Sequence, residues 1–281
     1  MFDSRGWPGV AARRGSGDNG KRIRMSRIFH PRSGKALVVP MDHSVTIGPL
    51  GKADHADRTA AILASAGADA VIVHKGRARA IDPTRFGDMA LIVHLSAGTD
   101  LAIHRTSKVI VGSVEECLRL GADGVSVHVN VGSPTEAVQL TDLGAVAAEC
   151  DALGVPLLAM MYARGPELTE PDGVTTLAHL GAIATDLGAD IVKLDYAGSP
   201  AAMDEVVDSC PLPILVAGGP AIGDDDDAIA FGSEVAKANV AGLSFGRTIF
   251  GATDPHRVAA ELVSALHATA ARPLSAALES V

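Results

Sequence analysis

Three stretches of the chain repeat one pattern: SAGADAVIV at residues 65–73, RLGADGVSV at 119–127 and DLGADIVKL at 186–194. In each copy a helical pattern runs up to a glycine, which suits the left-handed residue that ends a helix. A β-branched apolar run then begins two or three residues later. A recurring junction of this kind indicates a chain built from repeated strand and helix units.

Eight short apolar runs alternate with longer helical patterns, such as the one at residues 173–187. The runs are nearly continuously apolar, as expected for parallel strands buried on both faces. Eight such units in roughly 240 residues predict an α/β protein with a single-domain (β/α)8 TIM barrel. A doubly wound open sheet is the alternative, but the first strand-to-helix turn lacks a G-x-G-x-x-G fingerprint. The predicted strands are LVVPM, AVIVH, ALIVH, GVSVH, PLLAMMY, DIVKL, PILVA and AGLSF.

Composition narrows the class of protein further. The chain has 281 residues, of which 47% are apolar and only 3% aromatic, which favours α/β architecture over a β-sandwich. A net charge of −9 disfavours nucleic acid or an anionic membrane as partner. Without an apolar signal region or a run of eighteen apolar residues, the protein is expected in the cytoplasm. Cys117, Cys150 and Cys210 lack C-x-x-C spacing and are expected to be reduced, with two or three of them buried.

We predict three segments along the chain. Residues 1–20 are rich in Gly, Arg and Ser and are expected to form a flexible leader. Residues 21–271 form the barrel, and residues 272–281 form a tail. Neither end carries recognisable chemistry.

Function in a TIM barrel lies where strands end and the following loops begin. Polar and glycine residues at those places are the candidates for a site. They are Asp42, His43, His74, Lys75, His94, His128, Asn130, Tyr162, Arg164, Lys193, Gly218, Gly219, Gly246 and Arg247.

Lys193 stands in the sixth strand, DIVKL, where its apolar neighbours predict burial. A buried ammonium without a partner is costly, so a structural ion pair with Asp195 or Asp42 is one interpretation. At the mouth of a barrel, desolvation instead favours a neutral amine that can attack a carbonyl. We therefore predict that Lys193 is a nucleophile that forms a Schiff base.

The turns after the last two strands contain Gly218 and Gly219, then Gly246 and Arg247. Glycines in these turns leave main-chain N–H groups free to bind a phosphate, and an arginine adds a bidentate donor. Ordinary tight turns are the alternative.

Asp42 and Tyr162 are candidates for the proton transfers that a Schiff-base reaction needs. Asp42 could equally cap the following loop, and Tyr162 could be a core ring with its hydroxyl on a carbonyl. Arg164 and Lys75 are candidate partners for a substrate carboxylate, although surface ion pairing explains them equally well.

Four strand-end histidines, His43, His74, His94 and His128, form a rival constellation that could hold zinc. Strand one offers Asp-His rather than His-x-His, and no acidic residue closely follows the other three, so we expect no metal and no cofactor. The acidic run at residues 224–227 favours a helix N-terminus and is expected to stay solvated.

At these residues the chain resembles the archaeal-type class I aldolases of the DeoC and fructose-bisphosphate aldolase superfamily, from Met25 to His267. The motifs VVPMDHS, LIVHLSAGT, VSVHVNVGS, PLLAMMYARG, DIVKLDYAG and VAGGP are most similar to 2-amino-3,7-dideoxy-D-threo-hept-6-ulosonate synthases. An actinobacterial branch of these enzymes joins dihydroxyacetone phosphate to aspartate semialdehyde. The Ala-rich, Arg-biased composition favours that branch.

The resemblance implies that Lys193 forms the imine, Asp42 accepts a proton and Tyr162 donates one. It also implies that the glycines and arginine of the last two turns hold a phosphate, with His43 and Arg164 as further substrate-binding candidates. A homo-oligomer, with a ring-based decamer as one form, is implied too. Fructose-bisphosphate aldolases of this type carry tryptophan two residues before the tyrosine, where this chain has Met160.

The sequence therefore predicts a class I aldolase that condenses a phosphorylated ketone, such as dihydroxyacetone phosphate, with aspartate 4-semialdehyde. The product would be a C7 amino-keto acid precursor of 3-amino-4-hydroxybenzoate or 3-dehydroquinate. Alternatives are a fructose-1,6-bisphosphate aldolase and a metal-dependent barrel aldolase or hydrolase. A sugar-phosphate isomerase would need an acidic residue where Tyr162 stands, and a non-catalytic binding protein gives no reason to bury Lys193.

Overall fold

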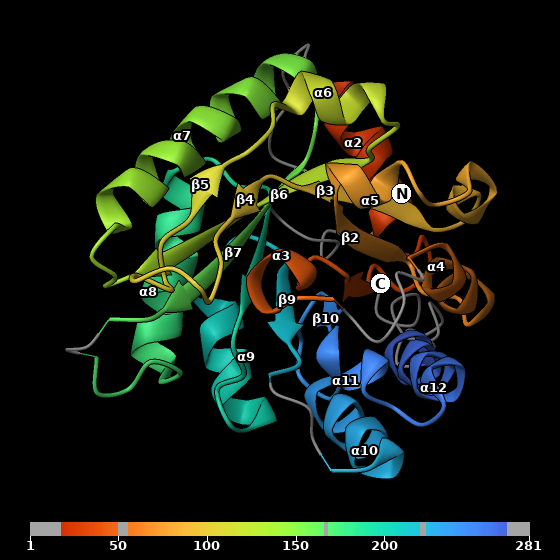
Figure 1. Ribbon diagram of the computed structural model, residues 1–281. Helices are drawn as coiled ribbons and strands as arrows, with labels where there is room; N and C mark the ends of the chain where they lie inside the picture. The colour runs from red at the N-terminus through yellow and green to blue at the C-terminus, as the bar shows by residue number, and fades with distance from the viewer. Residues whose placement is uncertain (1–17, 50–55, 166–167, 220–222, 269–281) are drawn as a thin grey trace, which may run out of the picture.

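The computed structural model describes residues 18–49, 56–165, 168–219 and 223–268, and they form a closed parallel barrel of eight strands inside a ring of helices (Figure 1). The predicted TIM barrel is confirmed, and each predicted run overlaps one barrel strand. The strands are β1 (Ala36–Pro40), β2 (Ala70–His74), β3 (Ala90–His94), β6 (Gly124–Val131), β7 (Leu157–Ala163), β8 (Ile191–Leu194), β9 (Ile214–Ala217) and β10 (Gly242–Ser244).

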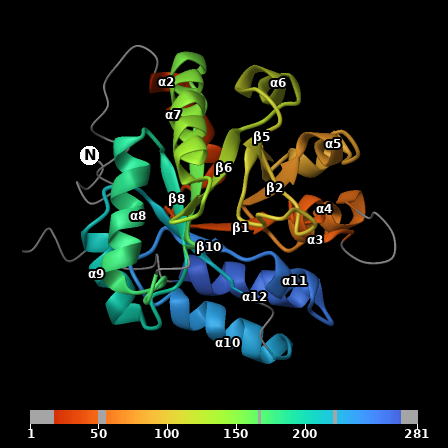
Figure 2. The ribbon, with the colours of Figure 1, turned by 60° about the vertical axis from the view of Figure 1, so that its left-hand side comes forward.

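Helices lie outside the strands on all sides, as the turned view in Figure 2 also shows. None of the described helices is long and apolar enough to cross a membrane. The larger helices are α2 (Asp18–Ile28), α4 (Ala56–Ser65), α6 (Val114–Arg119), α7 (Glu136–Leu153), α8 (Val174–Asp186), α9 (Pro200–Asp208), α10 (Asp225–Val235) and α12 (Pro255–Ala268). Short helices are α3 (Ser44–Ile47), α5 (Lys75–Ala78), the 3-10 turn η1 (Pro83–Phe86) and α11 (Arg247–Phe250).

The repeated junctions have a structural role that the sequence pattern alone did not reveal. Their glycines take the expected positive φ angles, 82° at Gly67, 84° at Gly121 and 90° at Gly188. The aspartate two residues after each glycine accepts a hydrogen bond from the main-chain N–H at the start of the preceding barrel strand. These bonds are Leu37 to Asp69 (2.7 Å), Leu91 to Asp123 (3.0 Å) and Leu157 to Asp190 (2.9 Å).

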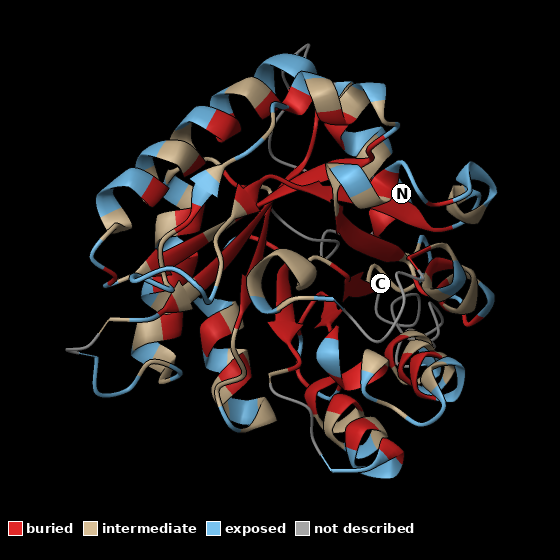
Figure 3. Cartoon of the chain, in the orientation of Figure 1, coloured by how far each residue is buried: buried red, intermediate tan, exposed pale blue. Residues whose placement is uncertain are grey.

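Side chains alternate along each strand between two apolar layers. In β1, Ala36 and Val38 point into the barrel, whereas Leu37 and Val39 pack under the helices. Figure 3 shows the result, buried strands within helices whose outer faces are exposed. Helix α2 adds Met25 and Ile28 to the inner layer and so closes the end of the barrel where the strands begin.

Several details correct the expectations from sequence. Residues 18–20, which we placed in the leader, belong to α2, while residues 1–17 and the predicted tail lie outside the described residues. Strands β6 and β7 run further than predicted, so His128, Asn130 and Tyr162 lie within strands rather than after them. All three cysteines are free and buried, as predicted.

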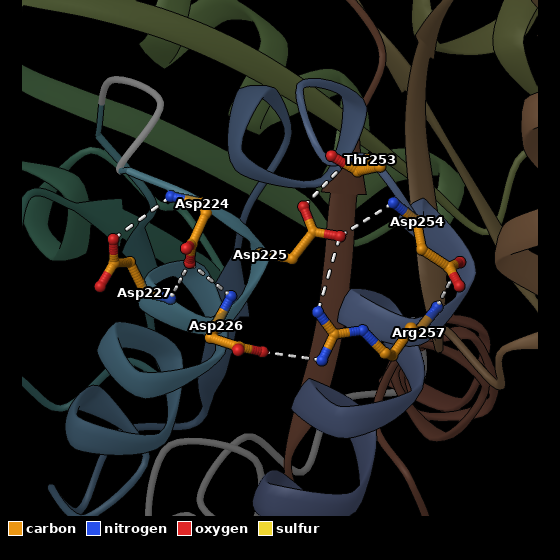
Figure 4. Close-up of polar contacts among 7 residues, drawn as sticks. All are labelled: Asp224, Asp225, Asp226, Asp227, Thr253, Asp254 and Arg257. Carbon is orange, nitrogen blue, oxygen red and sulfur yellow. Dashed lines mark hydrogen bonds and ion pairs between the residues drawn. The ribbon is translucent and has the colours of Figure 1, made fainter.

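The acidic run is only partly solvated (Figure 4). Asp224 and Asp227 form a capping box at the start of α10, which confirms the predicted helix N-terminus. Asp225 is buried, which contradicts the expectation that the whole run is solvated. Its carboxylate accepts hydrogen bonds from the main-chain N–H groups of Thr253 and Asp254, at 2.8 and 2.9 Å. Asp225 therefore fastens α10 to the start of α12.

The barrel closes where β1 pairs with β10, and the first pair in that register is Ala36 with Gly242. Gly242 has a φ of 156°, and a Cβ atom at this position would lie 1.9 Å from the carbonyl oxygen of Ala36. Only glycine lets the last strand approach the first this closely.

Replacing Gly242 by alanine is expected to lower the free energy of unfolding by about 3 kcal/mol or more, because the methyl group overlaps the main chain of Ala36. Gly144→Ala is the matched control. Nothing lies within 4 Å of a Cβ at that position in α7, so a gain of about 0.5 to 1 kcal/mol is expected. Urea denaturation measures both changes, and equal stabilities for the two variants would contradict this description of the closure.

Candidate active site

A cavity of about 660 Å³ opens at the carboxyl ends of the barrel strands. All nine residues that the sequence put forward as catalytic or substrate-binding line it. They are Asp42, His43, Tyr162, Arg164, Lys193, Gly218, Gly219, Gly246 and Arg247. Lys75, also considered for a substrate carboxylate, is not among the lining residues and pairs with Glu116 at 2.9 Å.

Lys193 lies on β8, in register with Met160 of β7 and Leu215 of β9, and only 6% of its surface is exposed. No hydrogen bond or ion pair joins it to any of the described residues. Asp195 is instead paired with Arg164, at 3.2 Å. The interpretation of Lys193 as one half of a structural ion pair is therefore wrong, and its amine faces the cavity unpaired.

Asp42 lines the cavity beside two histidines. Its carboxylate lies 3.6 Å from His94 Nε2 and 3.8 Å from His43 Nδ1, and it caps no helix. Burial raises the pKa of Asp42, but attraction to His94, His43 and Lys193 outweighs burial and lowers that pKa to about 2. Asp42 is therefore ionised at neutral pH and acts electrostatically on Lys193.

The buried histidines are held by polar neighbours. His94 Nδ1 lies 2.8 Å from Ser126 Oγ, and His128 Nε2 lies 2.9 Å from Asn130 Oδ1. Desolvation lowers the pKa of His94 to about 4 and that of His128 to about 3, so both are neutral at pH 7. Within the described part of the chain, no three His, Cys, Asp or Glu side chains are grouped closely enough to hold a metal ion.

Tyr162 lies beside the imidazole ring of His128 and the guanidinium group of Arg164. The centroid of the His128 ring lies 4.8 Å from that of the Tyr162 ring, and the guanidinium carbon of Arg164 lies 4.9 Å from the Tyr162 centroid. Its hydroxyl makes no hydrogen bond with a described residue, so it is not held by a main-chain carbonyl as the alternative interpretation required. Tyr162 is thus half-buried at the cavity wall with its hydroxyl available.

The two glycine turns lie side by side at the ends of β9 and β10. Arg247 Nη2 donates a 3.0 Å hydrogen bond to the carbonyl oxygen of Gly219, which ties the turns together. A Cβ at Gly246 would lie 2.6 Å from Pro40 O and 2.7 Å from His43 Cε1, so this turn requires glycine. Among the described residues, none accepts a hydrogen bond from the main-chain N–H of Gly219 or Gly246. The turns therefore offer free donors and a cation to an anionic group.

Sequence reasoning missed several polar residues of the cavity, among them Ser244, Tyr196 and Lys108. Ser244 and Tyr196 line it with buried hydroxyls that have no partner among the described residues. Lys108 comes from the segment between β3 and β6 and is 7% exposed. Ser244 could have been found from its place just before Gly246 on the last strand. The unusual length of the segment that carries Lys108 was the available signal for that residue.

The fold and the cavity together define a (β/α)8-barrel enzyme in which a buried, unpaired lysine stands beside a turn pair suited to phosphate. The chain belongs to the DeoC/LacD family of aldolases, whose profile matches residues 36–252.

Individual relatives agree with this class. The chain is 44% identical, over 90% of its length and 92% of the relative's, to 2-amino-4,5-dihydroxy-6-oxo-7-(phosphonooxy)heptanoate synthase of Streptomyces griseus. It is 40% identical, over 89% of its length and 92% of the relative's, to 2-amino-3,7-dideoxy-D-threo-hept-6-ulosonate synthase of Halobacterium salinarum. Among solved structures, an archaeal fructose-1,6-bisphosphate aldolase whose catalytic lysine carries a carbinolamine superposes with a TM-score of 0.80. That structure is 26% identical and covers 89% of this chain and 100% of its own.

The neutral, buried histidines predict how stability depends on pH. Their pKa values lie below the value of about 6.5 that histidine has when unfolded, so protons bind the unfolded chain more tightly. The free energy of unfolding should therefore fall as the pH drops below about 6.5, and the loss is complete below pH 3. From pH 7 to pH 5, His94 and His128 should each contribute a loss of about 2 kcal/mol.

Replacing His94 by asparagine, which can still bond to Ser126, should make the loss between pH 7 and pH 5 smaller by about 2 kcal/mol in urea denaturation. His104→Asn is the control, because His104 is exposed and its replacement should leave the pH dependence as in the unaltered protein. An unchanged pH dependence in His94→Asn would show that His94 is not held neutral by burial.

Proposed function

We propose that this protein is a class I aldolase in which Lys193 forms an imine with dihydroxyacetone phosphate, and the resulting enamine adds to aspartate 4-semialdehyde. The observation that carries the proposal is the buried Lys193 amine, which faces the cavity without an ion-pair partner among the described residues. A lysine amine in this position can attack the carbonyl carbon of a bound ketone, which is the step that forms an imine. Membership of an aldolase family supports this role.

The donor would place its phosphate in the two glycine turns. Free N–H groups at Gly219 and Gly246 and the guanidinium of Arg247 can bind phosphate oxygens. Lys193 is on β8, next to β9 in the barrel, so a carbonyl one carbon from the phosphate can reach its amine. The unpaired Ser244 hydroxyl, between the turns and the barrel interior, is available to a donor oxygen.

The chemical steps follow from this placement. Lys193 Nζ attacks the ketone carbon, and the carbinolamine loses water to give an iminium ion. Loss of a proton from the hydroxymethyl carbon gives an enamine, which forms a carbon-carbon bond to the aldehyde of the acceptor while the aldehyde oxygen takes up a proton. Water then hydrolyses the new iminium, which releases the ketone product and restores the amine.

Asp42 and Tyr162 fit different parts of this sequence. With a pKa of about 2, Asp42 remains a carboxylate and stabilises the positive iminium that forms beside it. Tyr162 carries a free hydroxyl at the cavity wall and can exchange protons with the carbinolamine oxygen or the aldehyde oxygen. We propose the tyrosine as the proton donor.

The substrates are inferred from the product that names the Streptomyces griseus relative. Breaking its bond between carbons 4 and 5 leaves dihydroxyacetone phosphate, which carries the phosphate and the ketone, and aspartate 4-semialdehyde, which carries the carboxylate and the amine. The Halobacterium salinarum relative is named for a 7-deoxy product that lacks this phosphate. The free donors of the turns favour a product that keeps its phosphate. A homo-oligomer and a cytoplasmic location remain predictions.

The direct test is a choice of acceptor. With dihydroxyacetone phosphate as donor, condensation with aspartate semialdehyde should be at least about 100-fold faster than with glyceraldehyde 3-phosphate, measured as product by mass spectrometry. Activity should survive EDTA, because no step uses a metal. Faster turnover of glyceraldehyde 3-phosphate would identify a fructose-1,6-bisphosphate aldolase, and loss of activity in EDTA would favour the metal-dependent alternative.

A further inference from the structure

Lys108 is a second buried lysine at the cavity, and the proposed chemistry gives it no role. It lines the cavity and is 7% exposed, comparable with Lys193. Its amine makes one hydrogen bond among the described residues, a long one of 3.5 Å to the carbonyl oxygen of Gly98. Burial lowers the pKa of Lys108, while attraction to Asp42 and Asp100 opposes that shift. The site thus contains a cation that the protein itself leaves largely unsatisfied.

The segment that carries Lys108 is built to hold it in place. Strand β4 (Ser96–Ala97) pairs with β5 (Val109–Ile110), and Lys108 directly precedes β5. The carbonyl oxygen of Thr106 accepts hydrogen bonds from Asn130 Nδ2 at 2.7 Å and from Gln139 Nε2 at 3.0 Å. Both donors are buried residues, so the segment is anchored to β6 and α7.

Two further contacts fix the other end of this segment. The main-chain N–H of Asp100 donates to Thr46 O at 3.0 Å, which joins the segment to α3. Gly98 lacks the Cβ that would lie 2.2 Å from Ser107 O and 3.0 Å from Lys108 Cδ. The lysine side chain therefore packs against a position that only glycine can occupy.

The other strong cations of the cavity are already engaged. Arg164 is paired with Asp195 and lies over the Tyr162 ring. Arg247 belongs to the phosphate-binding turns, and Lys193 is the proposed nucleophile. Among the lysines and arginines that line the cavity within the described residues, Lys108 is the one left for another anion.

Lys108 also lies on the correct side of the barrel for the second substrate. Its charge acts on His94 of β3 and His128 of β6, the third and fourth barrel strands. The phosphate-binding turns follow the seventh and eighth strands, so they lie opposite in the ring. Figure 1 shows the β4–β5 hairpin on the β6 side of the barrel, away from β9 and β10.

We infer that Lys108 binds the carboxylate of the acceptor aldehyde and so selects an anionic acceptor. The inference rests on the proposed function. A donor whose phosphate lies in the turns and whose ketone is at Lys193 extends its reactive carbon away from the turns. The acceptor then approaches from the side of β3 and β6. Its anionic end, which the C7 product keeps at the opposite end from the phosphate, reaches Lys108.

The test compares aspartate semialdehyde with its methyl ester, which has the same chain and amine but no carboxylate charge. In the unaltered protein, kcat/KM for the acid should exceed that for the ester by about 10- to 100-fold, the range of a hydrogen bond to a charged group. Lys108→Met should reduce this ratio to near 1, mainly through the KM of the acid. Lys108→Arg should keep most of the ratio, because the charge remains.

Lys75→Met is the matched control, since Lys75 is a lysine at the same end of the barrel that pairs with Glu116 and does not line the cavity. In Lys75→Met, the ratio of kcat/KM for the acid to kcat/KM for the ester should equal that of the unaltered protein. If the unaltered protein does not prefer the acid to the methyl ester, the inference is overturned before any variant is made. The same holds if Lys108→Met slows acid and ester equally, or if Lys108→Arg loses the preference. Failure of the proposed function looks different, because the unaltered protein would then turn over neither acceptor.

Discussion

The parallel pairing of β1 with β10 is the constraint on which the molecule depends. It requires Gly242 at the point where the two strands approach, and it turns eight separate strands into a ring. Once the ring is closed, every strand ends at the same mouth. Residues as far apart in sequence as Asp42, Tyr162 and Arg247 are then brought to one cavity by the fold rather than by local structure.

The electrostatics of that cavity follow from burial. His94 and His128 are neutral at pH 7 because desolvation outweighs their attraction to Asp42, whereas the surrounding imidazoles and Lys193 lower the pKa of Asp42 to about 2 and keep it ionised. Lysines and arginines supply the positive charge around the wall. An aldolase that joins two anionic substrates needs this arrangement, because separate cations can hold the two anionic ends apart while the reactive carbons meet between them.

Sequence patterns predicted the barrel well because strands buried on both faces are nearly continuously apolar and their junctions repeat. Lys193 could be found because one charge in such a strand is conspicuous, and the glycine turns because they follow the last two strands. Lys108 could not, because it lies in an irregular segment whose pairing and anchoring depend on distant residues such as Gln139 and Thr46. The buried role of Asp225 was missed for the same reason, since its partners come from another loop.

Reductive trapping measures directly whether Lys193 forms the imine. The protein is incubated with dihydroxyacetone phosphate and borohydride, digested, and the modified lysine is located by mass spectrometry. A single adduct on Lys193, absent from a Lys193→Met variant, is the predicted result. An adduct on Lys108, the other buried lysine of the cavity, or no adduct at all would show that Lys193 does not form the imine.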